Sequence, residues 1–362
     1  MRSILTALTI SAALVIAAPA HAQLGKLGQR VKEASDKAKE AKEKADKFLF
    51  TDAEEHQLGS DISAMLRDKY GVVQDKAVHK YVTLVGTVLA QASSRPALGW
   101  TFIVLDTDGV NAFAAPGGFI HITRGALALI QNEAELADVL GHEISHVTAK
   151  HTINAIRKAN VAEKAADQAR QDFVKQVANK AYEMLLENKY DRGDEMDADK
   201  NGVMLANAAG YAPGGLSAFL TRLSERNKDL QDRSGLFASH PEAKARMDGL
   251  AKVIAASKLS AAATVAPRFH QAISYKPVPV SQIASVAGAS EPKPAEAKPG
   301  GGKFGLSGMN PLGKEKTGTQ TVASAGSRGV NPDRDAKGGP NKALVAVSVT
   351  TADVADFKKG IV

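Results

Sequence analysis

The sequence contains no cysteine and few aromatic residues. None of its 362 residues is Cys, and Phe, Trp and Tyr together make up 5% of the chain. The missing Cys excludes disulfide bonds, thiol nucleophiles, iron–sulfur clusters and Cys-ligated zinc. The scarcity of aromatic rings argues against a platform on which the bases of single-stranded nucleic acid could stack.

Long hydrophobic runs are also missing, and one short run lies at the N-terminus. Residues 4–18 are predominantly apolar, a stretch too short for an ordinary transmembrane helix. Arg2 precedes this run, and small residues at positions 20 and 22 form a cleavage site. Residues 1–22 therefore indicate a signal peptide cleaved after Ala22, with an uncleaved membrane anchor as the alternative. An exported chain without Cys fits a Gram-negative periplasm, where we expect this protein.

The middle of the chain lacks the basic character of a nucleic-acid-binding protein. The formal net charge is +7, but the surplus lies at the two ends, as +3 over residues 26–48 and +4 over residues 285–342. Arg2 adds one more charge, so the rest of the chain is near neutral. This pattern predicts no nucleic-acid partner. The basic ends indicate either solvated segments or weak peripheral contact with a membrane or peptidoglycan.

Composition divides the chain into five segments. The stretch near the C-terminus that holds 12 of the 31 Gly and 6 of the 14 Pro is predicted to be disordered, because it offers no apolar periodicity. The last residues regain strand character over 343–351 and helical character over 352–359. We assign no role to this C-terminal element. The segments are a signal peptide (1–22), a charged helical linker (23–49), a folded domain (50–284), a disordered tail (285–342) and a short C-terminal element (343–362).

The folded domain is predicted to be α+β and mainly helical. Two short β-branched runs, residues 101–106 and 119–123, predict strands. We expect residues 119–123 to form an edge strand beside a cleft, with an ordinary core strand as the alternative. Hydrophobic periodicity places helices elsewhere: two within 53–94, an almost unbroken stretch over 132–190, and further helices at 195–209, 214–227 and 242–257.

Residues 142–146 read His-Glu-Ile-Ser-His, the spacing found in zinc hydrolases. On a helix, positions i and i+4 lie one above the other, so His142 and His146 can converge on one metal ion. Glu143 is then angled toward a water molecule on that metal. A surface helix with two chance histidines is the alternative. The motif predicts a metal site with a carboxylate base.

The surroundings of this motif favour a helix that lines a cleft. Asn132 and Glu135 form a start that resembles a capping box. His142 and His146 lie opposite a stripe of apolar side chains, and His151, about 140° away from the pair, is given no role. The apolar stripe consists of Leu136, Leu140, Ile144 and Val147.

A catalytic zinc ion needs a third protein ligand and one open position. Ala149 and Thr152 occupy the positions where an extended three-His pattern has Gly and His, so that class is excluded. Glu195 and Asp199 are four residues apart and share a helix face. One of them can ligate zinc while the other accepts the second ring N–H of a ligand His. A solvated acidic helix start is the alternative.

Four motifs, in order, resemble the zinc metallopeptidase family of CAAX prenyl endopeptidases, HtpX-like proteases and soluble periplasmic outer-membrane quality-control proteases. The resemblance covers about residues 50–255. Residues 110–120 are similar to the family's NAF-x-x-PGG strand, residues 132–146 to its NEAEL…GHE-x-x-H helix, residues 192–211 to its R-x-x-E-x-x-AD…AGY helix, and residues 239–246 to its HP-x-x-x-x-R segment.

The resemblance implies a gluzincin-type zinc metallopeptidase domain, with a small sheet beside the active-site helix and one Zn²⁺ per chain. It implies that His142, His146 and Glu195 bind zinc. It also implies that Glu143 is the general base and that Asp199 supports a ligand from behind. The transmembrane helices of the CAAX and HtpX branches are absent, so the chain resembles the soluble periplasmic branch, and prenylated substrates are not expected.

His240 matches the His of the family's HP segment, and three roles are open for it. In the periplasmic members, the matching His can ligate the zinc and hold the enzyme latent, which is the role we favour. The second possibility is an oxyanion donor, for which Tyr190 is another candidate. The third is a surface histidine without a role. Pro241 biases His240 toward extended backbone, which suits a loop tip.

These features predict a zinc-dependent endopeptidase of the cell envelope. Its substrates are expected to be unfolded or misassembled envelope proteins, whose peptide bonds are hydrolysed by metal-activated water. A non-catalytic periplasmic chaperone that uses the same cleft is the alternative, against which the intact Glu143 argues. A surface-adhering structural protein is a third possibility, supported only by the basic ends.

Overall fold

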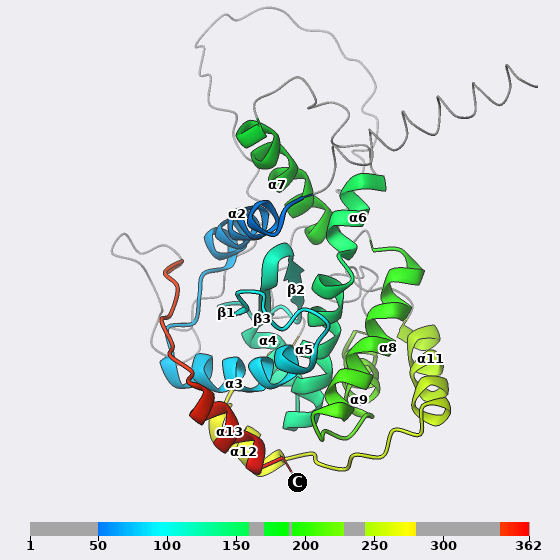
Figure 1. Ribbon diagram of the computed structural model, residues 1–362. Coiled ribbons are helices and arrows are strands. Elements are labelled where there is room, and N and C mark those ends of the chain that lie inside the picture. Colours follow the sequence, from blue (N-terminus) through cyan, green and yellow to red (C-terminus); the bar gives the residue numbers. More distant parts are fainter. Residues whose placement is uncertain (1–49, 159–169, 188–189, 228–242, 280–340, 362) are drawn as a thin grey trace, which may run out of the picture. The chain divides into compact units, whose positions relative to one another are not determined.

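The computed structural model describes residues 50–158, 170–187, 190–227, 243–279 and 341–361. These residues lie within one unit, Phe50–Val362. The predicted signal peptide, the predicted charged linker, most of the predicted disordered tail and His240 lie outside the described residues. The elements are labelled in Figure 1.

Two helices open the described chain, as its hydrophobic periodicity predicts. Helix α2 (Asp52–Tyr70) begins with a capping box, in which the Thr51 hydroxyl accepts a bond from the Glu54 N–H and the Glu54 carboxylate accepts one from the Thr51 N–H. Gly71 ends this helix with φ of 74°, a backbone conformation that suits glycine. Helix α3 (Lys76–Ala92) follows after a short connection.

The small sheet has three strands in the order β1-β3-β2. Strand β1 (Thr101–Leu105) runs parallel to β3 (Phe119–Thr123), and β2 (Ala112–Ala115) pairs antiparallel with β3. The prediction of residues 119–123 as an edge strand is therefore wrong, because β3 is central and all five of its residues are buried. The short helix η1 (Pro116–Gly118) connects β2 to β3, and β1 and β2 are the two edge strands of the sheet.

Helix α5 (Glu133–Thr148) runs through the centre of the molecule (Figure 1). It begins where predicted, at Asn132, whose side chain accepts a bond from the Glu135 N–H. Its apolar face packs against α3, the sheet and α9 (Gly215–Arg226). The predicted apolar stripe is fully buried there, with Leu136, Leu140, Ile144 and Val147 each at most 3% exposed.

The remaining helices surround this core, and those predicted at 195–209, 214–227 and 242–257 are confirmed. The helical stretch predicted over 132–190 is confirmed among the described residues by three helices, with an interruption at residues 149–150 where Lys150 adopts φ of 58° and redirects the chain. The surrounding helices are α4 (Arg124–Leu129), α6 (His151–Lys158), α7 (Arg170–Glu187), α8 (Arg192–Ala208), α11 (Ala243–Ala256) and α12 (Ala266–Ala272).

Residues 341–361 return to the domain after the long predicted tail. The helical character predicted at 352–359 is confirmed by α13 (Thr351–Lys359), but the strand predicted over 343–351 is wrong. A strand needs a continuous ladder of backbone bonds. This segment instead makes separate bonds, in which the Asn341 carbonyl accepts from the Val72 N–H at 2.6 Å and other carbonyls accept from Arg67 and Gln74 side chains.

Helix α13 is tied to the central helix through Arg268. The Arg268 guanidinium lies 3.9 Å from the ring centre of Phe357 and donates to the Phe357 carbonyl at 2.9 Å. It also pairs with Glu133, the fully buried first residue of α5. The Glu133 carboxylate accepts two more bonds, from the hydroxyls of Tyr81 at 2.8 Å and Tyr211 at 2.7 Å. The C-terminal segment therefore shares one buried charge network with the centre of the domain.

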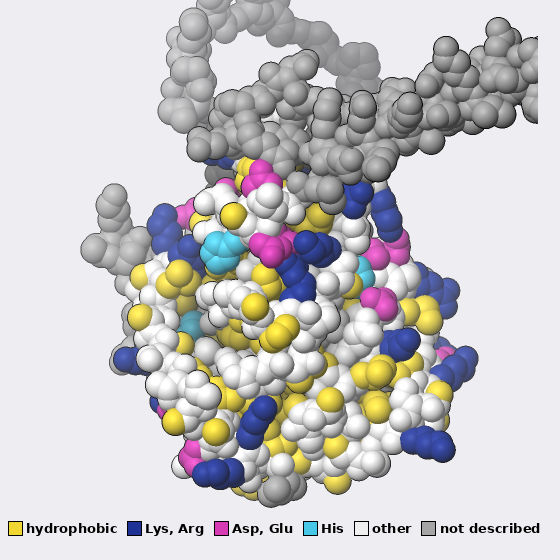
Figure 2. Space-filling model, viewed as in Figure 1, with side chains coloured by type: hydrophobic (Ala, Val, Ile, Leu, Met, Phe, Trp, Pro, Cys, Tyr) yellow, Lys and Arg dark blue, Asp and Glu magenta, His cyan; other side chains and the backbone are white. Residues whose placement is uncertain are grey.

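The surface mixes charged and apolar side chains. On the face shown in Figure 2, Lys and Arg side chains are scattered and do not gather into one patch. Among the helices of the described residues, none combines the length and the hydropathy that a membrane span requires.

Replacing the Phe357 ring should destabilise the domain. We expect Phe357→Ala to lower the free energy of unfolding by about 2 kcal/mol, because the cation–π contact with Arg268 and the packing against Tyr81 are both lost. Urea denaturation measures this change. Leu344→Ala is the control, because Leu344 is 51% exposed, and it should leave stability unchanged. Equal stability of Phe357→Ala and the wild type would show that the C-terminal helix does not stabilise the domain.

Candidate metal centre

Helix α5 brings the two histidines of the predicted motif together. His142 and His146 lie one turn apart, with their Nε2 atoms 3.0 Å from each other. Both side chains are buried, at 3% and 1% exposure. Burial lowers the pKa of His142 to about 3. The ring is therefore neutral at physiological pH, which is the form that ligates metal ions.

Helix α8 supplies a carboxylate to the same point. One Glu195 oxygen lies 3.4 Å from His146 Nε2, and the other lies 3.7 Å from His142 Nε2. Asp191 caps this helix by accepting the Asp194 N–H, so Glu195 stands in the first turn. One atom from each of His142, His146 and Glu195 lies within 4.8 Å of the others. The structure thus brings together the three residues predicted as ligands.

Two glycines allow α5 and α8 to approach closely enough for this convergence. A Cβ atom on Gly202 would lie 2.6 Å from the backbone N of His142 and 2.9 Å from the carbonyl carbon of Gly141. A Cβ atom on Gly141 would lie 2.8 Å from the Gly202 carbonyl oxygen. The backbones of the two helices are therefore in contact at this crossing, with no room for any side chain between them.

Asp199 holds the outer nitrogen of His142, as the resemblance implies. Its Oδ1 lies 2.9 Å from His142 Nδ1. Arg246 of α11 binds the same carboxylate with two bonds, at 2.9 and 2.6 Å, and lies 3.2 Å from a Glu195 oxygen. Burial alone would raise the pKa of Asp199, but the Arg246 guanidinium and the His142 ring lower it below its usual value. Asp199 is therefore an anion that accepts the His142 Nδ1–H and directs Nε2 toward His146.

Glu143 lies beside the convergence point with a carboxyl group that is 1% exposed. Burial, together with the nearby Glu195, raises the pKa of Glu143 to about 7, against the opposing effects of His146 and Arg246. A carboxyl group with a pKa near the surrounding pH both accepts and returns protons readily.

The three converging residues fit a bound metal ion. Two donors on a tetrahedral ion at about 2.0–2.1 Å from it are separated by roughly 3.3 Å. The two ring nitrogens are 3.0 Å apart, one Glu195 oxygen lies 3.4 Å from His146 Nε2, and the other lies 3.7 Å from His142 Nε2, all close to this value. Two neutral imidazoles and one carboxylate are also a common donor set of catalytic zinc sites.

The sequence comparison matches this geometry. Residues 76–254 match the model of Peptidase family M48. This range includes the site residues described above, namely His142, Glu143, His146, Glu195, Asp199 and Arg246. Residues 76–254 form a peptidase family M48 domain. The family expected from the four motifs is therefore confirmed for this part of the chain, which is a metalloprotease domain. Proteases of family M48 depend on a metal ion, as expected for this site.

Three curated relatives illustrate what this chain is similar to. A putative beta-barrel assembly-enhancing protease of Vibrio cholerae is 27% identical over 197 residues, 51% of this chain and 40% of the relative. The mitochondrial metalloendopeptidase OMA1 of Arabidopsis thaliana is 28% identical over 182 residues, with shares of 50% and 37%. The beta-barrel assembly-enhancing protease of Escherichia coli is 22% identical over 208 residues, with shares of 54% and 42%. The chain thus spans about two fifths of these curated relatives.

Two further residues of the M48 domain stand against His146. His151 Nδ1 lies 3.0 Å from His146 Nδ1, although the helical geometry of a continuous helix places it 140° away. The break at Lys150 explains the difference. Tyr190 stacks on the His146 ring at 4.1 Å between centres, and its hydroxyl bonds Thr152 at 2.7 Å. Sequence reasoning gave His151 no role, because a spacing of five residues on a continuous helix points its ring away from His146.

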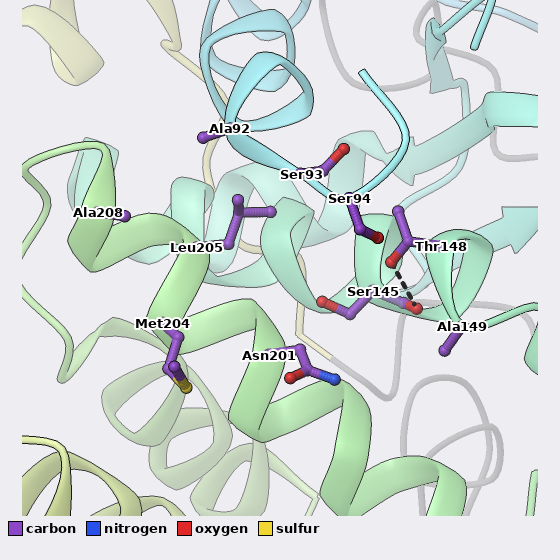
Figure 3. A pocket seen from close by; sticks show the side chains of 10 residues that line it. All are labelled: Ala92, Ser93, Ser94, Ser145, Thr148, Ala149, Asn201, Met204, Leu205 and Ala208. Atoms are coloured by element: carbon purple, nitrogen blue, oxygen red, sulfur yellow. Dashed lines mark hydrogen bonds between the residues drawn. The ribbon is translucent and has the colours of Figure 1, made fainter. Parts of the chain in front are cut away.

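A separate pocket lies at the crossing of α3, α5 and α8 (Figure 3). Its volume is about 380 Å³, and no His, Asp or Glu lines it. The predicted site residues therefore take no part in it. Its lining consists of Ala92, Ser93, Ser94, Ser145, Thr148, Ala149, Asn201, Met204, Leu205 and Ala208.

A Gly→Ala change at the α5–α8 crossing and one away from it should have opposite effects on the stability of the domain. Gly202→Ala should destabilise the M48 domain by about 1–3 kcal/mol and weaken metal binding, because a methyl group there collides with the backbone of α5. Gly249→Ala is the matched control within α11, where only the flexible Met196 methyl lies nearby, at 3.9 Å. That change should stabilise by up to about 1 kcal/mol through helix propensity. Denaturation and metal titration measure both variants; a stabilising Gly202→Ala would contradict the tight crossing.

Proposed function

We propose that the protein is a zinc endopeptidase of the cell envelope that cleaves unfolded or misassembled proteins. The observation that carries the proposal is the convergence of His142, His146 and Glu195, with Glu143 adjacent to the first of these ligands. Peptide hydrolysis at a metal site needs this combination of ligands and base.

The donor set favours zinc as the metal, with one ion per chain. His142 and His146 would hold it through Nε2, and Glu195 through its carboxylate. A bound zinc ion would supply Lewis-acid chemistry, by lowering the pKa of water and by polarising the scissile carbonyl.

Glu143 is proposed as the general base. Its buried carboxyl group, with a pKa of about 7, takes a proton from the attacking water and returns it to the leaving amine. Asp199 and Arg246 are proposed to support the ligand His142 without binding the metal themselves. The Arg246 guanidinium holds the Asp199 carboxylate, and this carboxylate holds His142. Because these charged groups are buried together, removing one of them leaves its partner uncompensated.

Two residues are candidates for stabilising the oxyanion. Tyr190 belongs to the site, since its ring packs on His146, but its hydroxyl bonds Thr152. It would have to exchange this bond for one to the substrate. His240 is outside the described residues, so its assignment as an oxyanion donor or as a zinc-bound plug stays a prediction.

Strand β2 is the proposed docking strand for an extended substrate. In the described sheet it pairs with β3 on one side and stands at the edge on the other. It packs beside α5, and its Ala114 carbonyl accepts a bond from Thr152 at 3.3 Å. All four residues of β2 are buried, so substrate backbone could add to this edge only if Thr152 moves away from the Ala114 carbonyl. Main-chain bonds formed there would demand little side-chain identity. Such recognition suits unfolded chains of many sequences.

The envelope location rests on the predicted signal peptide and on the names of the relatives. Two of the relatives compared above are named for beta-barrel assembly, which supports envelope proteins as substrates. A chaperone that uses the same cleft without catalysis remains the second candidate. The presence and placement of Glu143 favour the enzyme.

Replacing the proposed base should separate catalysis from metal binding. Glu143→Gln is expected to reduce cleavage of unfolded casein by about 10²–10⁴-fold while leaving the zinc content unchanged, because Gln cannot accept the proton. Glu183→Gln on α7 is the matched control, because its side chain is 53% exposed and far from the motif in sequence. Undiminished turnover, or loss of zinc from Glu143→Gln, would show that Glu143 has another role.

Metal removal tests the cofactor. Dialysis against a chelator should abolish casein cleavage, and one equivalent of Zn²⁺ per chain should restore it, since two imidazoles and a carboxylate suit zinc. Mg²⁺ should fail, because it requires octahedral oxygen ligands. Full activity of the metal-free protein would refute the proposed mechanism.

A further inference from the structure

We infer that His151 is a positioning residue for the ligand His146. This inference rests on the proposed zinc site and extends it. The two rings face each other through Nδ1 atoms 3.0 Å apart, and both side chains are buried, at 5% and 1% exposure. At this distance one nitrogen donates a proton and the other accepts it, so the two rings fix each other's tautomer.

The direction of the bond follows from the opposite side of His146. Its Nε2 faces the Nε2 of His142 at 3.0 Å and an oxygen of Glu195 at 3.4 Å, so this atom must present a lone pair to a metal ion. The ring proton of His146 is therefore on Nδ1, and it is donated to the Nδ1 of His151. His151 carries its own proton on Nε2.

Two carboxylates stand behind His151. Its Nε2 lies 3.5 Å from an oxygen of Asp197 and 3.8 Å from an oxygen of Asp194. These negative charges favour a proton on Nε2 and leave Nδ1 as the acceptor. The order from the metal outward is thus His146, His151 and the two carboxylates of α8.

The interruption of the helix between α5 and α6 creates this contact. Lys150 has φ of 58° and ends the helical path, so that α6 begins with His151 directed back at His146. Lys150 is held in place by Glu55, whose carboxylate lies 2.8 Å from its ammonium group and also binds Arg95. A residue other than glycine with positive φ is uncommon, because its side chain crowds the backbone there. In this protein the positive φ of Lys150 accompanies the placement of the buried His151 ring against the ligand His146.

The two ligand histidines are therefore supported in different ways. His142 is held directly by the carboxylate of Asp199, at 2.9 Å. His146 is held by the imidazole of His151, which relays the effect of carboxylates farther away. Partners behind ligating histidines typically contribute about 10- to 100-fold to metal affinity.

Zinc affinity tests this role independently of catalysis. The measurements use the full-length Glu143→Gln protein and competition for Zn²⁺ with a chromophoric chelator. His151→Phe, which keeps a ring but removes the acceptor nitrogen, should bind zinc about 10- to 100-fold more weakly. His151→Asn offers an acceptor oxygen at the position of Nδ1 and should restore most of the affinity. His270→Ala, at an exposed histidine of α12, is the control and should leave affinity unchanged.

The outcomes separate this inference from the proposed function. If the parent binds zinc and His151→Phe binds it equally well, His151 has no positioning role and only the inference fails. If His151→Asn binds as weakly as His151→Phe, the effect is packing alone, and the inference also fails. If the parent binds no zinc, the proposed zinc site fails and the inference fails with it. His151→Ala serves as a second acceptor-free variant if the Phe ring impairs folding, which thermal unfolding of the metal-free proteins reveals.

Discussion

The close crossing of α5 and α8 is the constraint on which the site depends. Neither helix carries a complete metal site, because α5 brings two histidines and a base, and α8 brings the carboxylates. Gly141 and Gly202 let the two backbones touch, and only then does Glu195 reach both imidazoles. Side chains of ordinary size at this crossing would separate the helices to a usual interaxial distance of about 8–10 Å.

The crossing also concentrates buried charge, and the domain compensates it internally. Arg246 contacts both Asp199 and Glu195, so one guanidinium balances two carboxylates that face the histidines. At the start of α5, Arg268 plays the corresponding part for Glu133. Buried charges persist only where such partners and hydrogen bonds are present. The central helix is therefore anchored by an ion pair at its first residue, while the ion pairs of Arg246 join α11 to the carboxylates of α8 that face its histidines.

The M48 match covers residues 76–254, whereas the folded unit extends farther in both directions. Helix α2 precedes the match and contributes Glu55, which binds Lys150 at the junction behind His146. Helix α13 follows it and packs on Arg268. Helix α2 is thus linked to the C-terminal end of α5, and α13 is linked through Arg268 to its N-terminal end. The site is therefore supported by parts of the chain that carry none of the recognisable motifs.

The sequence by itself determined the HExxH helix, its cap at Asn132 and its apolar face, because these features follow from helical periodicity and local capping. Spacing left Glu195 and Asp199 open as the third ligand, and the resemblance to the family selected Glu195. Tertiary structure alone decided that 119–123 is the central strand, since strand order depends on pairing partners distant in the chain. It also decided the position of His151. Helical geometry holds only while the helix continues, and the left-handed conformation of Lys150 redirects the next residue toward His146. The Lys150 side chain pairs with Glu55, about a hundred residues earlier, a contact that local sequence rules do not predict.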